Sequence, residues 1–372
     1  MASFLPQEIV DAVLICLDPD KDRPALQSCA MVCREWNSVV RPHLFREITV
    51  NGEDDVYSLL DLLEDAPGIG LVVQDLIVKG GTVYGGPFFL ELVAESLPSV
   101  LPNLTSLTWS WLTLTHYSPP ISTHLLNFNK VTHLRVRWCT CPVQTLWAYI
   151  SALPSLQELS ISDHQSFRKR SDDRVTGEIS PTSRLTALVL IRSQRIRTFL
   201  ELVTGSPWVQ SIQSLTTIAH DWTSLWVSDI LLAIGPSLIH LDLILRVYYS
   251  IQAHPDRLDL NANTNLRDLT LRVFAIDDNL IHTIISRLTL EHLRSLHIHI
   301  DHFHESHLDP FRGVLNSLPG RQARLPSLRI VKFFANPECY DEMLLSLQQD
   351  MDEFNAGGRS LTVALVPGLQ TS

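Results

Sequence analysis

The chain has 372 residues, of which 60 are leucine, and its 45% apolar and 19% charged residues suffice for a large core and exclude general disorder. Its net charge of −11 argues against nucleic acid or an anionic membrane as the main partner, because the long-range field would repel both. The six cysteines form no C-x-x-C pair, and the N-terminal residues lack the pattern of a secretory signal. We therefore expect reduced thiols in a protein of the cytoplasm and/or nucleus, without membrane spans.

The first 46 residues contain two helical patterns. Behind Pro6, one apolar face is formed by Ile9, Val13, Cys16 and Leu17. Pro24 begins a second helix, which Arg41 and Pro42 are expected to end. Its apolar side carries Leu26, Cys29, Ala30, Cys33, Trp36 and Val40. The remaining apolar residues fit neither inner face and predict a partner surface or a contact with the following segment: Leu5, Met31, Val32 and Phe45.

Three segments of this region resemble an F-box: L-P-x-E-I at 5–9, A-L-x-x-C-A-x-V-C-R-x-W at 25–36 and R-P-x-L-F at 41–45. The resemblance covers residues 4–46 and implies a small all-α module that binds a Skp-family adaptor and, through it, a cullin. It also implies which side chains lie at or beneath that contact: Leu5, Pro6, Ile9, Leu26, Cys29, Val32, Cys33, Trp36 and Phe45.

Beyond this module, the pattern apolar-x-x-apolar-x-apolar recurs ten times, from Val73, Leu76 and Val78 to Leu328, Val331 and Phe333. Seven of the nine spacings lie between 25 and 29 residues, which is typical of leucine-rich repeats with one strand and one helix per unit. Helices are expected over 89–97, 143–153, 199–203, 227–234, 279–288 and 310–318. A polar loop is expected over 164–183, and the tail is expected to form a helix (341–354) and a last strand (361–365).

The repeat is irregular, because the Asn or Cys that usually follows the strand and bonds to turn backbone is present only as Cys139 and Asn336. The predicted fold class is α/β. Residues 1–46 form the F-box-like helical domain, and residues 47–372 form a leucine-rich-repeat solenoid of about ten irregular repeats with a C-terminal cap. Its parallel strands line the concave face and its helices lie outside. The combination resembles the F-box/leucine-rich-repeat proteins, especially the divergent fungal type.

Strand alternation predicts which side chains point outward onto the concave face. By count, these positions hold five Lys or Arg residues against one acid. We hypothesise that this face binds an acidic or phosphorylated segment of an unknown target protein, since guanidinium groups hold carboxylate and phosphate bidentately. The alternative is a set of ordinary solvated strand residues. The candidate target-binding residues are Arg135, Arg137, Arg272, His297, His299 and Lys332.

Seven of the 15 histidines fall between positions 282 and 307. His297 and His299, with Asp301 and His302 nearby, contain donors that suit a transition metal. A solvated or partner-facing cluster is favoured, because structural zinc usually needs four well-spaced ligands. Such a cluster can still titrate near neutral pH. No phosphate loop, dinucleotide fingerprint, G-x-S-x-G or H-E-x-x-H motif occurs. We therefore expect no catalytic, metal or cofactor site.

These patterns together favour a substrate-recognition adaptor of a Skp–cullin–F-box ubiquitin ligase that acts in ubiquitin-dependent degradation. Two alternatives stay open. One is a leucine-rich-repeat scaffold without a ligase role, and the other is a sensor that binds a small ligand on the concave face.

Overall fold

The computed structural model describes residues 9, 12–13, 16–17, 22–80, 87–114, 119–162, 183–191, 197–219, 225–245, 260–273, 290–300, 313, 325–335, 341, 345, 348, 352 and 362–367. The chain forms two compact units. Unit 1 comprises Met1–Gln157 and His164–Ser183, and unit 2 comprises Glu158–Asp163 and Arg184–Ser372. Among the described residues, no helix is long and apolar enough to cross a membrane.

Unit 1 begins with two packed helices, α2 (Arg23–Ala30) and α3 (Arg34–Phe45). The single second helix expected here is wrong, because Cys33 is extended and its sulfur accepts a hydrogen bond from the Trp36 N–H as the cap of α3. Pro42 does not end α3 but lies inside it, in the last turn, where it removes one helical N–H donor. Leu26 and Val40 form the buried core of the helix pair.

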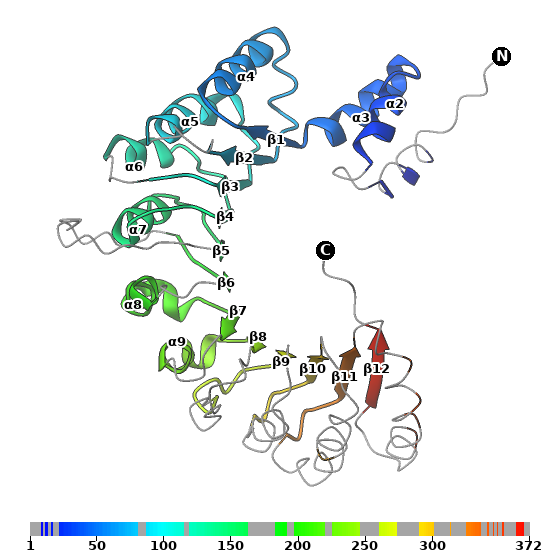
Figure 1. The fold of residues 1–372 in the computed structure, drawn as a ribbon, viewed down its shortest axis with the longest axis vertical. Coiled ribbons are helices and arrows are strands. Elements are labelled where there is room, and N and C mark those ends of the chain that lie inside the picture. The colour runs from blue at the N-terminus through cyan, green and yellow to red at the C-terminus, as the bar shows by residue number, and fades with distance from the viewer. Residues whose placement is uncertain are drawn as a thin grey trace. The chain divides into compact units, whose positions relative to one another are not determined.

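The helix pair leads directly into a parallel sheet. Strands β1 (Glu47–Val50), β2 (Asp75–Lys79), β3 (Ser106–Ser110) and β4 (His133–Arg137) pair in sequence order. Helices follow on one side of these strands (Figure 1): α4 (Glu53–Asp65), α5 (Pro87–Val100), α6 (Pro119–Leu125) and α7 (Val143–Ser151). The expected helices at 89–97 and 143–153 are confirmed as α5 and α7.

Unit 2 repeats the same parallel arrangement. Its strands are β5 (Glu158–Ser162), β6 (Ala187–Ile191), β7 (Ser214–Ala219), β8 (His240–Leu245), β9 (Asp268–Val273), β10 (Ser295–Ile300), β11 (Ile330–Ala335) and β12 (Thr362–Pro367). Its helical segments are α8 (Arg197–Thr204), η1 (Pro207–Gln210), α9 (Leu225–Ile234) and η2 (Gly235–Ser237). The expected helices at 199–203 and 227–234 are confirmed as α8 and α9, and the expected last strand is confirmed as β12.

All ten strands expected from the leucine pattern are present as β2–β11. Their register places equivalent apolar residues side by side, as in Leu76, Leu107 and Leu134, which are all buried. The parallel strands and intervening helices are those of a solenoid-like α/β arrangement in each unit. The expected loop at 164–182 and the expected helices at 279–288, 310–318 and 341–354 lie outside the described residues, apart from a few isolated positions.

Five elements of the described part of the chain were not predicted, namely β1, α4, α6, η1 and η2. Residues of α4 do carry a helical apolar face, because Val56, Leu59 and Leu63 are buried at spacings of three and four. This helix precedes the first copy of the leucine pattern, so the period of the repeat gave no signal for it.

Side chains in the turns before the strands bond to backbone carbonyls of the preceding repeat. Ser211 donates to Leu185 O at 2.7 Å, and Ser237 donates to Ile212 O at 2.9 Å. The fully buried Asn263 serves the end of α9, because its Nδ2 donates to Leu231 O at 2.9 Å and to Gly235 O at 2.8 Å. Asn263 was missed because it precedes its strand, whereas the expected Asn follows the strand.

Replacing Asn263 by Ala leaves two buried carbonyls without this donor, and we expect it to lower the free energy of unfolding by about 2 kcal/mol. Asn265→Ala is the matched control, since Asn265 is exposed and donates only to Pro236 O among the described residues. Its expected cost is below about 1 kcal/mol. Urea unfolding followed by circular dichroism measures both, and equal losses would contradict the assignment.

Candidate functional site

The helix pair of unit 1 carries the residues expected at the adaptor contact. Val32 is 65% exposed, and Ile9 is also exposed. Leu26 is buried in the core of the pair and therefore lies beneath any contact. The other described members are half-buried: Cys29, Cys33, Trp36 and Phe45. Leu5 and Pro6 lie outside the described residues.

The turn between α2 and α3 also exposes an apolar residue that is not among those expected at the adaptor contact. Met31, next to Val32, is 83% exposed, and Val13 is also exposed. Exposed apolar residues gathered on so small a helical module are typical of a partner surface. The earlier signal for Met31 was its failure to fit the inner face of a helix.

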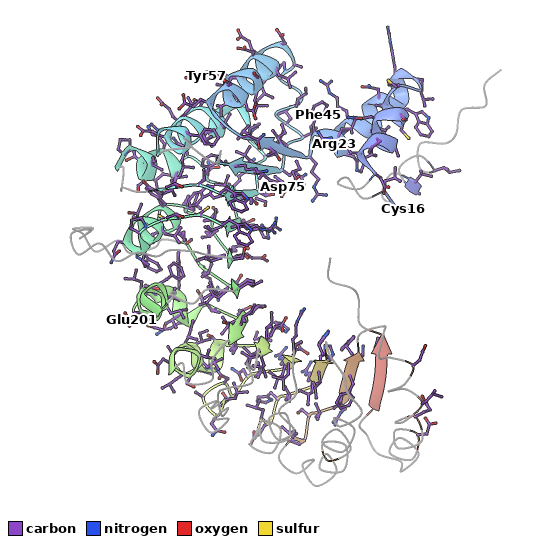
Figure 2. The ribbon with its side chains drawn as sticks, viewed as in Figure 1. Cys16, Arg23, Phe45, Tyr57, Asp75 and Glu201 are labelled. Carbon is purple, nitrogen blue, oxygen red and sulfur yellow. The ribbon has the colours of Figure 1, made fainter. Side chains whose placement is uncertain are left out.

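The helix pair is joined to the strands without a linker. Phe45 ends α3 and Glu47 begins β1, and Figure 2 shows Phe45 at this junction. The carbonyl of Arg46 accepts hydrogen bonds from the N–H groups of Gln74 and Asp75 at 2.8 and 3.0 Å. The Arg46 guanidinium also lies 3.5 Å from the Asp75 carboxylate. The junction is therefore part of the strand ladder.

In each unit, "outward face" denotes the strand side chains that alternate with the buried row. On β4, Arg135 and Arg137 lie on this face and are exposed, while Leu134 and Val136, which alternate with them, are buried. Their register partners on β3 are the small side chains of Thr108 and Ser110. On β2, the exposed Lys79 occupies the position in register with Ser110. Three cations thus lie at or near the carboxyl ends of these strands.

In the described part of the chain, Arg272 in unit 2, unlike Arg135 and Arg137, forms an ion pair within the sheet. Its Nε donates to Asp242 Oδ1 at 3.1 Å and its Nη2 donates to Oδ2 at 2.8 Å. Both residues lie on the outward face, where Asp268 at the start of β9 is a further acid. This bidentate pair compensates the charge of Arg272, so Arg272 is less available to an external anion than an unpaired guanidinium.

His297, His299 and Lys332 lie together on β10 and β11 around Phe334. The rings of His299 and Phe334 are stacked at 4.1 Å, and His297 meets Phe334 edge-on at 5.6 Å. Burial, the Arg272 charge and His297 lower the pKa of His299 to about 4. Burial and the Lys332 charge likewise lower the pKa of His297. His299 is therefore a neutral ring at pH 7 and does not titrate near neutral pH.

No group of three or more His, Cys, Asp or Glu residues that could hold a metal ion occurs among the described residues. Asp301 and His302, the other candidate ligands, lie outside them. A His–Asp–Ser set does occur on the first positions of β8, β9 and β10, where Asp268 contacts both His240 (2.7 Å) and Ser295. Because the carboxylate lies between the imidazole and the hydroxyl, this set does not have the order of a nucleophilic triad.

Two tryptophans directly after β3 and β4 were missed by sequence reasoning. Strand alternation places residues 111 and 138 inward, yet Trp111 is 49% exposed and Trp138 is half-buried. Their φ angles of 58° and 54° reset the alternation, so that Leu112 and Cys139 are buried instead. The two indole rings are stacked with centroids 5.1 Å apart and planes within 6°.

Gly80 stands at the same position after β2 as Trp111 does after β3. The Gly80 N–H donates to Ser110 O at 2.8 Å, just as the Trp111 N–H donates to Arg137 O at 3.0 Å. A Cβ at Gly80 would lie 2.3 Å from the backbone oxygen of Trp111, so only glycine fits here. The stack therefore ends at Trp111 on the β2 side.

A family model described as F-box-like matches residues 2–51 of the chain. The match covers the helix pair and β1, and it contains the segment 4–46 that resembles an F-box. No curated protein matches the chain. The chain therefore contains an F-box-like domain, and F-box domains generally bind Skp-family adaptors.

The depressed pKa of His299 predicts a pH dependence of stability. The pKa is about 4 in the folded chain against an ordinary value of 6.5, so the fold favours the neutral ring. The neutral ring of His299 therefore contributes to the free energy of unfolding above pH 6.5, and this stabilisation is lost as the pH falls from 6.5 toward 4. We expect His299→Gln to lose less stability than the wild-type chain between pH 7 and pH 5, as measured by urea unfolding at each pH. Equal losses would contradict the assignment.

Proposed function

We propose that this chain is the substrate-recognition adaptor of a Skp–cullin–F-box ubiquitin ligase. The F-box-like domain binds the Skp-family adaptor and through it the cullin, and the outward strand faces hold an unknown target protein. The chain itself is a non-catalytic subunit. It acts in the cytoplasm and/or nucleus, with neither nucleic acid nor membrane as its main partner.

The observation that carries this proposal is the F-box-like match at residues 2–51 on a helix pair with exposed apolar side chains. Met31 and Val32 project from the turn between α2 and α3, while Leu26 and Val40 hold the pair together from within. The exposed surface and the buried core thus consist of different residues, so a partner can cover Met31 and Val32 without disturbing the packing of Leu26 and Val40.

The junction with the sheet supports the same role. Because Arg46 O accepts bonds from Gln74 and Asp75, the helix pair and the first strands of unit 1 are held as one piece. A ligase must present its target at a defined distance from the transferring enzyme, and a linker-free junction suits that requirement. In this proposal the strands and helices after the junction are leucine-rich repeats, and their outward faces capture the target.

The test is co-purification of the full chain with a Skp-family adaptor and a cullin. We expect the wild-type chain to capture both and Val32→Asp to capture neither, because a carboxylate would be desolvated at the contact. Leu232→Asp is the matched control, since Leu232 is 69% exposed on α9 in unit 2 and should not affect capture. A double substitution, Leu5→Ala with Pro6→Ala, tests the first motif segment.

Failure of the wild-type chain to bind the adaptor would refute the proposal, as would equal capture by Val32→Asp and the wild type. Capture of the adaptor without cullin would instead favour the scaffold without a ligase role. Circular dichroism of each variant shows that any loss of capture is not a loss of folding.

A further inference from the structure

Trp111 and Trp138 adopt positive φ angles, which strain the backbone and turn the two indole rings away from the buried row. A positive φ is a genuine outlier for a bulky residue, and it persists only where the surroundings fix it. Here the surroundings are ladder bonds, because the Trp111 N–H donates to Arg137 O, and Thr140 N donates to Leu112 O at 2.8 Å. The same feature occurs after two successive strands. Glycine adopts a positive φ without this strain, so folding alone does not require tryptophan at these positions.

The exposed stack adjoins uncompensated cations. Trp111 directly follows Ser110, and Trp138 directly follows Arg137. Lys79 and Arg137 lie on the two sides of Ser110 in register, about 10 Å apart at two strand spacings. Among the described residues, no ion pair involves Lys79, Arg135 or Arg137. The acids on these strands, Glu47 and Asp75, stand at the opposite, amino ends.

We propose that this surface of unit 1, formed by Lys79, Trp111, Arg135, Arg137 and Trp138, binds an acidic protein segment that carries an aromatic residue or a proline. The aromatic ring or the proline ring packs on the exposed indole of Trp111. Carboxylate or phosphate groups on either side of it bind Arg135, Arg137 and Lys79. This inference rests on the proposed function, in which an outward strand face captures the target.

The cations of this surface select the oxyanions of the ligand, and the indole stack selects its ring. Guanidinium groups on adjacent positions of one face can hold one oxyanion bidentately or two oxyanions separately. The small side chains of Thr108 and Ser110 leave room beside them, because neither reaches as far as its neighbours on β2 and β4. The indole stack adds apolar contact area at low cost in side-chain entropy. A basic or purely aliphatic segment would satisfy neither half.

The experiment pans the full chain, alone and together with the Skp-family adaptor, against two random peptide libraries. The first contains only the standard amino acids, and the second also contains phosphoserine and phosphothreonine. We expect enrichment of peptides with acidic residues around an aromatic residue or proline. The two libraries distinguish the source of the oxyanion, since selection from the first assigns carboxylate and selection only from the second assigns phosphate.

Variants of the chain then test the surface with the best enriched peptide. Trp111→Gly removes the ring but keeps a residue that adopts positive φ freely, so the backbone is retained. Arg137→Glu reverses one cation. We expect each to weaken binding at least about tenfold. Lys130→Glu is the matched control, because Lys130 is an exposed cation in the turn before β4 and does not lie on the outward face. Lys332→Glu tests the outward face of unit 2 as the alternative site. Trp111→Phe should restore most of the binding lost in Trp111→Gly.

Enriched peptides without acidic residues, or binding unchanged in both Trp111→Gly and Arg137→Glu, would overturn the inference. Loss of binding in Lys332→Glu alone would also overturn it and would move the site to unit 2. All variants should still capture the Skp-family adaptor. Adaptor capture without peptide enrichment therefore refutes this inference alone, whereas enrichment without adaptor capture refutes the ligase role alone.

Discussion

The register of the parallel strands is the constraint on which the rest of the molecule depends. Each strand pairs with the next so that equivalent apolar residues lie in one buried row, as in Leu188, Leu215 and Leu241 of unit 2. Because side chains alternate with a period of two, a slip of one residue would expose this row and bury the outward residues. The large apolar area of the buried row therefore fixes the position of every outward side chain, including the polar ones that contribute little to stability.

The same ladder holds the F-box-like domain. Gln74 O accepts bonds from Thr105 and Ser106, and Thr105 O accepts bonds from Thr132 and His133. Arg46 O accepts from Gln74 and Asp75 in the same pattern, although it follows a helix instead of a strand turn. Within unit 1, these bonds hold the residue that directly follows α3 in the strand ladder. The helix pair, with the exposed side chains of Met31 and Val32, is thus joined to the first strands without a linker.

The leucine period was sufficient to predict ten strands, because burying one apolar row is the dominant energetic requirement of each repeat. The period could not predict which outward residues meet. The Arg272–Asp242 pair joins residues 30 positions apart and depends on the register of β8 and β9. The break at Cys33 depends on a sulfur acting as a helix cap, which no spacing indicates. Trp111 was missed because regular alternation makes it inward, and only its positive φ turns it out.

The register also explains why the outward faces of the two units differ in charge. Asp242 lies diagonally from Arg272, two residues before Ile244, which is the register partner of Arg272. In unit 1, the residue two positions before the register partner of Arg137 is Thr108, and the one two positions before the register partner of Arg135 is Ser106. In unit 2 this diagonal position carries a carboxylate that occupies the guanidinium, and the neighbouring His299 is a neutral ring. In unit 1 the diagonal position carries a short hydroxyl side chain, so the guanidinium groups of Arg135 and Arg137 are not paired with a carboxylate there. One side chain at this diagonal position therefore decides whether an outward arginine pairs within the sheet or remains available to a partner.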